Sequence, residues 1–188
     1  MNENFEKALK VILDTKFEVS PRFLRLGNYN KNGILDVDFE QDGDVEYSSC
    51  SQIIYDDPGL LTYGQKEKFY YYFWKKLRCD NIECDMLRLH IFDMGVDCGI
   101  SRAVKIVQKL LAIKPDGIID EATLYHMNSQ KEFIYWNRWG INEFPMYLWQ
   151  KYVMERLSHY NHLVYAVNTD LLVFLNDWIN RVKKTNYL

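Results

Sequence analysis

The beginning of the chain changes its hydrophobic pattern from helical spacing to alternation. Apolar residues on one face predict an amphipathic helix over residues 3–16. After Pro21, apolar and charged residues alternate between turn signals at Asn32-Gly33 and Asp42-Gly43. This alternation predicts a small three-stranded antiparallel meander over residues 22–49, with one face in water.

Helical spacing returns after Pro58 and continues to the end of the chain. Thr62 followed by Gln65 is a capping-box pattern, so we expect a helix to begin there. Residues 86–96 are apolar on nearly all sides and predict a central buried helix. Ser101 and Asp120 can each cap a further helix. Residues 133–182 are expected to form two or three more helices, interrupted near 140–145 and 168–169.

These elements predict an α+β fold that is mainly helical, with a small antiparallel β-meander. We expect residues 1–57 to form a lobe of one helix and the meander. Residues 58–188 would form a helical lobe, and the two would pack as one compact unit.

Composition narrows the function classes. The 188 residues have a formal net charge of -3, and no dense basic face points to nucleic acid as a partner. No apolar run is long enough to span a membrane, and the acidic N-terminus is unlike a signal peptide. The four cysteines have no C-x-x-C spacing, so no metal site is expected. The predicted location is the cytoplasm, or outside the cell after lysis or dedicated export.

Three motifs share an order with a known family. They are Asp93-Met94-Gly95-Val96-Asp97-Cys98-Gly99, the turn Asp116-Gly117-Ile118-Ile119-Asp120, and Asn176-Asp177-Trp178-Ile179-Asn180-Arg181-Val182. Their order resembles the bacterial and phage N-acetylmuramidases of glycoside hydrolase family 108, also called secretion activator proteins. Asp97 stands where that family usually has asparagine, and Asp120 where it often has glycine.

The resemblance implies a lysozyme-like fold with C-terminal peptidoglycan-binding helices. It also implies hydrolysis of the β-1,4 bond between N-acetylmuramic acid and N-acetylglucosamine, without a cofactor. The expected partner is the glycan strand of peptidoglycan, and the expected state is a monomer.

The catalytic acid is the point at which the chain departs from the family. Such hydrolysis needs a protonated carboxyl beside the scissile oxygen and a second assisting group. The family places its glutamate in Glu-Gly-Gly-Tyr after the first helix, whereas this chain has no Gly-Gly pair there. Glu18 is the nearest glutamate, and Phe17 could supply an apolar wall. The candidates for the second group are Asp42, Asp44 and Glu46, which also fit a solvated hairpin face.

Four other side chains are candidates for sugar contact: Tyr72, Trp74, Asp93 and Asp97. The aromatic rings also fit helix cores, and a buried aspartate commonly satisfies local donors, so structural roles are the alternative. The Asn- and Asp-rich segments 28–36 and 38–46 echo calcium loops, but both lack the closing glutamate. We favour plain turns there.

Two functions from different classes remain open at this point. The first is a muramidase-like hydrolase of the bacterial cell wall. The second is a catalytically inactive relative that binds peptidoglycan or a protein partner, as the missing Gly-Gly pair and Asp97 would suggest.

Overall fold

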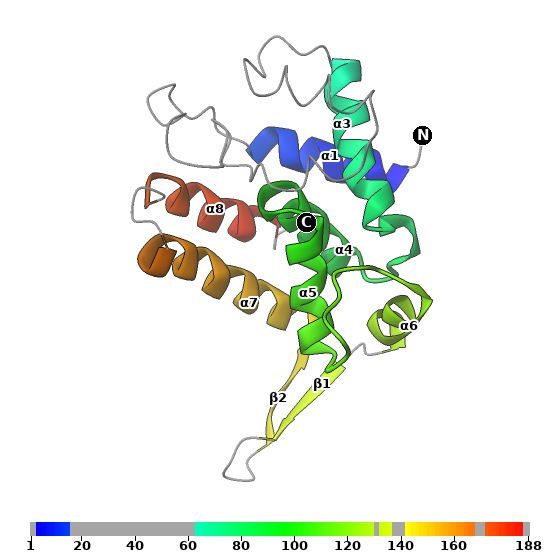
Figure 1. Cartoon of the computed structure of the whole chain (residues 1–188), viewed down its shortest axis with the longest axis vertical. Helices are drawn as coiled ribbons and strands as arrows, with labels where there is room; N and C mark the ends of the chain where they lie inside the picture. The colour runs from blue at the N-terminus through cyan, green and yellow to red at the C-terminus, as the bar shows by residue number, and fades with distance from the viewer. Residues whose placement is uncertain (1–2, 16–62, 130–131, 137–141, 168–171, 186–188) are drawn as a thin grey trace.

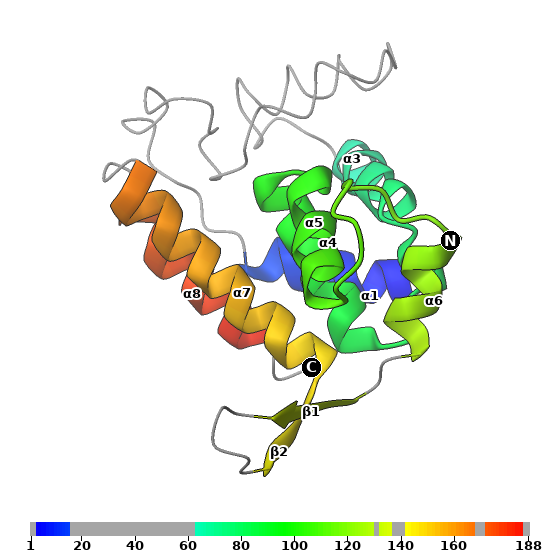
Figure 2. The same ribbon diagram turned by 60° about the horizontal axis from the view of Figure 1, so that its bottom comes forward.

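The computed structural model describes residues 3–15, 63–129, 132–136, 142–167 and 172–185. Its elements follow one another as α1 (Glu3–Thr15), α3 (Tyr63–Lys76), η3 (Cys79–Asn81), α4 (Asp85–Cys98), α5 (Ile100–Leu110), α6 (Glu121–Ser129), β1 (Glu132–Trp136), β2 (Asn142–Tyr147), α7 (Leu148–His162), the π-helical turn η4 (Leu163–Val167) and α8 (Leu172–Thr185). Figures 1 and 2 show these helices around α4, with α7 and α8 side by side.

Helix α4 is the centre of the fold, as its pattern predicted. Every residue from Leu87 to Cys98 is buried, and α3, α5, α7 and α8 all contact this helix. Gly95 permits the close approach of the Leu77 side chain, which directly follows α3, because a Cβ built at Gly95 would lie 2.6 Å from a Leu77 methyl carbon. Gly99 ends the helix at a φ of 89°, a conformation that favours glycine, and α5 begins at the next residue.

The predicted first helix is confirmed as α1, and aromatic packing joins it to α3 and α4. The ring of Phe5 meets Trp74 edge to face with centroids 5.5 Å apart, and Trp74 meets Phe92 at 5.2 Å. Such edge-on pairs are a preferred aromatic geometry. Helix α1 also contacts α8. The predicted boundary near residue 57 stays a prediction, because residues 16–62 lie outside the described part.

The turn between α5 and α6 contains the helix cap that the sequence predicted at Asp120. Gly117 has a φ of 86°, and its N–H donates to Gln108 Oε1 at 2.9 Å. The carboxylate of Asp116 accepts from Gln108 Nε2 at 2.8 Å. Asp120 caps α6 by accepting the N–H of Thr123 at 2.7 Å. These bonds fix how α6 leaves α5.

The predicted α+β fold class is wrong. The described residues are predominantly helical, and no β-meander is seen among them; the segment assigned to it, 22–49, lies outside the described residues. The sheet that is described is a two-stranded antiparallel hairpin of β1 and β2, at a position where we expected helix. The figures show it projecting from the helical body.

The hairpin has an irregular register that accommodates a proline. Glu132 lies opposite Tyr147, and Trp136 lies opposite Asn142, but the register shifts between Phe133 and Tyr135. Pro145 stands in the opposing stretch of β2. Proline cannot donate a ladder hydrogen bond, so strands carry it at edges or bulges. Pro145 therefore lies at an irregularity of a strand pair. From the sequence, a break between two helices was expected there.

Among the described residues, no helix is both long and apolar enough to cross a membrane.

Candidate functional site

The predicted catalytic residues cannot be placed. Glu18, Asp42, Asp44 and Glu46 lie outside the described residues, as do the two segments that echo calcium loops. Within the described ranges, no group of three or more His, Cys, Asp or Glu side chains could hold a metal ion. Glu18 as the acid therefore stays a prediction.

Asp93 and Asp97 face the interior of the helical body. They lie one turn apart on α4 and are 1% and 0% exposed. Arg156 of α7 pairs with Asp93, and its Nη2 lies 3.3 Å from Asp97 Oδ2. Arg181 of α8 pairs with Asp97, and its Nε lies 3.7 Å from Asp93 Oδ1. We call Asp93, Asp97, Arg156 and Arg181 the Asp–Arg cluster.

Tyr160 completes the surroundings of this cluster. Its hydroxyl donates to Asp97 Oδ2 at 3.1 Å and accepts from Arg156 Nε at 2.8 Å. Burial raises the pKa of Tyr160 well above its ordinary value, so the hydroxyl stays a donor. Burial strongly opposes the charge on Arg156, but the charge of Asp93, Tyr160 and the hydrogen bonds to both together outweigh burial and raise the pKa of Arg156. Two buried carboxylates and two buried guanidiniums thus compensate one another's charge.

This geometry gives Asp93 and Asp97 a structural role: they connect α4 with α7 and α8. Sequence reasoning had weighed that role for Asp93. The arginine partners could not be assigned, because Arg156 lies 63 residues from Asp93. Direct sugar contact by either aspartate stays an untested prediction.

The two predicted aromatic contacts occupy different environments on α3. Trp74 is fully buried, and its Nε1 donates to Asp80 Oδ1 at 2.6 Å. Tyr72 is half-buried, with the ammonium of Lys76 5.4 Å from its ring centroid. The structure does not bring these rings together with Asp93 and Asp97 in one groove among the described residues.

A surface groove lies where α6 and the start of α7 meet the η3–α4 connection. It consists of two adjoining hollows of about 370 and 410 Å³ that share Glu83 and Asn128. The first is also lined by Leu87, Met127, Tyr147 and Trp149, and the second by Asn81, Glu121, Tyr125 and Ser129. We call this surface the α6–α7 groove. The hollows are within the size range of small-ligand sites.

Asn128 connects the two sides of the groove through hydrogen bonds of its side chain. Its Nδ2 donates to the carbonyl of Asn81 at 2.9 Å, and its Oδ1 accepts the N–H of Glu83 at 3.0 Å. Beside the second hollow, Arg78 forms an ion pair with Glu121 at 2.6 Å. Side-chain bonds thus connect α6 with the segment before α4 along the groove.

Aromatic rings also line the groove. Tyr125 is 69% exposed and Tyr147 is 46% exposed. Trp149 is half-buried and stacks on His90, with ring planes 7° apart and centroids 6.3 Å apart. Rings with one open face, next to amide and carboxylate groups, can stack on a sugar and hydrogen-bond its hydroxyls.

The groove is suited to binding more than to acid catalysis. A glycosidic acid needs a carboxyl held neutral by an apolar wall, but Glu83 and Glu121 are exposed. Sequence reasoning missed this site, although the ring-bearing Tyr147-Leu148-Trp149 stretch before a helix was a signal.

Comparison with known proteins gives a fold relationship. No protein-family model and no curated protein sequence matches the chain. Among solved structures, SagA of Brucella abortus matches with a TM-score of 0.64 and 19% sequence identity. The match covers 97% of this chain and 91% of SagA. Because the sequence identity is low, the comparison shows a shared fold and no more.

Proposed function

We propose that this chain is a muramidase-like cell-wall protein that binds the glycan strands of peptidoglycan in the α6–α7 groove. The observation that carries the proposal is that two exposed aromatic rings, Tyr125 and Tyr147, line the same groove as Asn128, whose side chain is held by two hydrogen bonds. The motifs shared with muramidases and the SagA-like fold support the same class of protein.

Hydrolysis of the β-1,4 bonds is the second part of this proposal. Glu18 would act as the general acid, and one of Asp42, Asp44 and Glu46 as the assisting group. The alternative is a relative that binds glycan or a protein partner without cleaving the glycan. Binding and cleavage can be measured separately, and that separation decides between them.

The binding proposal is tested by replacing the two open rings. Tyr125→Ala and Tyr147→Ala should each weaken sedimentation with purified sacculi about five-fold, because each removes one stacking face worth about 1 kcal/mol. Tyr165→Ala is the matched control, since Tyr165 is 68% exposed on η4 and lines no part of the groove. Equal binding by all four proteins, or equal loss in the control, would contradict the groove assignment.

A further inference from the structure

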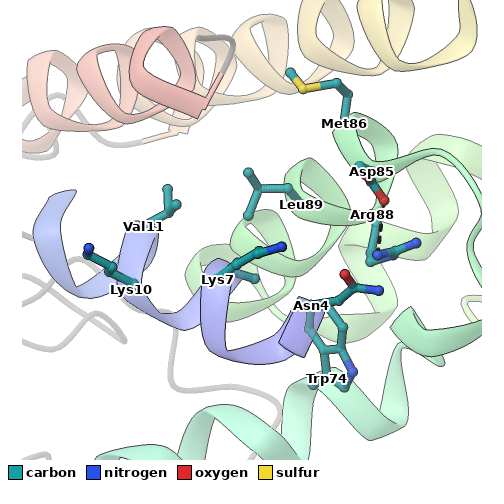
Figure 3. A pocket seen from close by; sticks show the side chains of 10 residues that line it. Asn4, Lys7, Lys10, Val11, Trp74, Asp85, Met86, Arg88 and Leu89 are labelled. Atoms are coloured by element: carbon teal, nitrogen blue, oxygen red, sulfur yellow. Dashed lines mark ion pairs between the residues drawn. The ribbon is translucent and has the colours of Figure 1, made fainter. Parts of the chain in front are cut away.

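A second surface pocket lies between α1 and α4, with a volume of about 390 Å³. Lys7, Ala8 and Val11 of α1 line one side, and Met86, Arg88 and Leu89 of α4 line the other. Figure 3 shows the labelled side chains of α1 and α4 around the space between the two helices, with Trp74 of α3 at one end. We call it the α1–α4 pocket. It shares no lining residue with the α6–α7 groove.

The interior of the α1–α4 pocket is apolar. Ala8, Leu89 and Trp74 form its buried part, and Val11 and Met86 are half-buried beside them. The indole nitrogen of Trp74 already donates to Asp80, so its polar atom has a partner. A ligand entering here would replace water against hydrocarbon, which is favourable for an apolar chain.

The rim of the same pocket is cationic. Three of its ten lining residues are basic and one is acidic, in a chain whose net charge is -3. Arg88 is already engaged, because it pairs with Asp85 at 3.1 Å and donates to the carbonyl of Ile82. The positive charge left for a ligand therefore comes from Lys7 and Lys10.

The two lysines are available to a ligand. Lys7 pairs with Glu3 at 2.6 Å, but both side chains are more than 70% exposed. Such exposed pairs contribute little and exchange readily. Lys10 is exposed one turn further along α1, on the side where Val11 meets the pocket. A ligand whose anionic head group lies between the two lysines would place its apolar tail over the interior of the pocket.

From this combination of an apolar interior and a lysine rim, we propose that the α1–α4 pocket binds a single acyl chain with a carboxylate head. Val11, Met86 and Leu89 would contact the chain, and Lys7 and Lys10 would pair with the carboxylate. Binding an acyl carboxylate goes beyond glycan binding and uses none of the groove residues.

The test uses the full chain and calorimetric titration with decanoate below its micelle concentration. We expect saturable one-to-one binding that weakens with added salt, because the head contacts are ionic. 1-Decanol lacks the charge and butyrate lacks the chain, so each should bind at least five-fold more weakly. Decanol binding as tightly as decanoate would overturn the role of the lysines, and no decanoate binding would overturn the proposal.

Variants separate the pocket from general charge effects. Lys7→Gln with Lys10→Gln should raise the dissociation constant of decanoate about five-fold and leave that of decanol unchanged. Lys109→Gln removes an exposed lysine on α5 and should have no effect. Equal loss in Lys109→Gln would overturn the site.

Two further measurements complete the test. Met86→Trp should fill the pocket and weaken the binding of both decanoate and decanol. If that variant fails to fold, the lysine variants still test the proposal.

The vesicle experiment tests a membrane surface as the ligand. Sedimentation with vesicles of anionic phospholipid, without binding of monomeric decanoate, would mean that a membrane surface is the ligand and would overturn the proposal. Sacculus binding should be unaffected by the lysine changes, so the glycan proposal fails or succeeds separately.

Discussion

Arg156 contributes to the interior through charge as well as through packing. It is fully buried, pairs with Asp93, and lies within hydrogen-bond distance of Asp97 and Tyr160. A buried charge is tolerated only when opposite charges and hydrogen bonds compensate its lost hydration. The position therefore depends on the guanidinium itself, which reaches several partners at once.

Removing that guanidinium should destabilise the fold strongly. Arg156→Ala leaves two buried carboxylates facing Arg181 alone, so we expect the free energy of unfolding to fall by about 3–5 kcal/mol. Urea unfolding followed by circular dichroism measures the change. Arg102→Ala is the control, because Arg102 is exposed on α5 and its loss should change stability by less than about 0.5 kcal/mol. Equal effects of the two variants would mean that the cluster contributes no special stability.

Helix α6 depends on its first residues for its position. Asp120 accepts the Thr123 N–H and so satisfies a backbone donor that no helical carbonyl can reach. Gln108 bonds to both Asp116 and the Gly117 N–H, which ties the same turn to α5. Since Tyr125 and Asn128 are carried on α6, this turn also sets one wall of the α6–α7 groove.

Loss of the cap should lower stability modestly and in a pH-dependent way. Asp120→Ala should reduce the Tm by about 2–4 °C at neutral pH, whereas Asp120→Ser should retain most of the cap. The hydrogen bond from Thr123 lowers the pKa of Asp120 below its ordinary 3.8. A lowered pKa stabilises the folded state above pH 4 and loses that contribution as the pH falls through the folded value.

Thermal scans at several pH values check this prediction. The Tm difference between wild type and Asp120→Ala should shrink below pH 4. A difference that stays constant down to pH 2 would show that the carboxylate charge is not what stabilises the turn.

Local signals predicted some elements and not others. The helix at α1, the buried α4 and the Asp120 cap were readable, because each depends on residues within a few positions of one another. In the β1 segment Glu132–Trp136, the four residues after Glu132 form an apolar run, and periodicity cannot separate a strand from a buried helix in such a short run. In the sequence, Pro145 indicated a break between helices, whereas in the structure it lies at an irregularity of the β1–β2 pair. The Asp–Arg cluster and the groove join residues more than 40 positions apart, so no local pattern encodes them.

The residues proposed for binding and for cleavage come from different parts of the sequence. The groove belongs to α6, α7 and the segment before α4, whereas the proposed acid, Glu18, follows α1. A glycan strand is a long polymer and can contact both regions. Binding to sacculi should therefore persist in a protein that cannot cleave, which makes the two steps independent in experiment.

This independence gives the decisive test of hydrolysis. Wild type incubated with purified sacculi should release soluble muropeptides, and Glu18→Gln should reduce release at least 100-fold, because the amide cannot donate the proton that the leaving group needs. Glu6→Gln is a matched control, since Glu6 is exposed on α1 and has no assigned role. Release is measured by chromatography of the supernatant, and sedimentation shows whether the variant still binds. Binding by wild type without any release would identify a glycan-binding protein that has lost hydrolysis, whereas equal release by wild type and Glu18→Gln would place the acid at another residue.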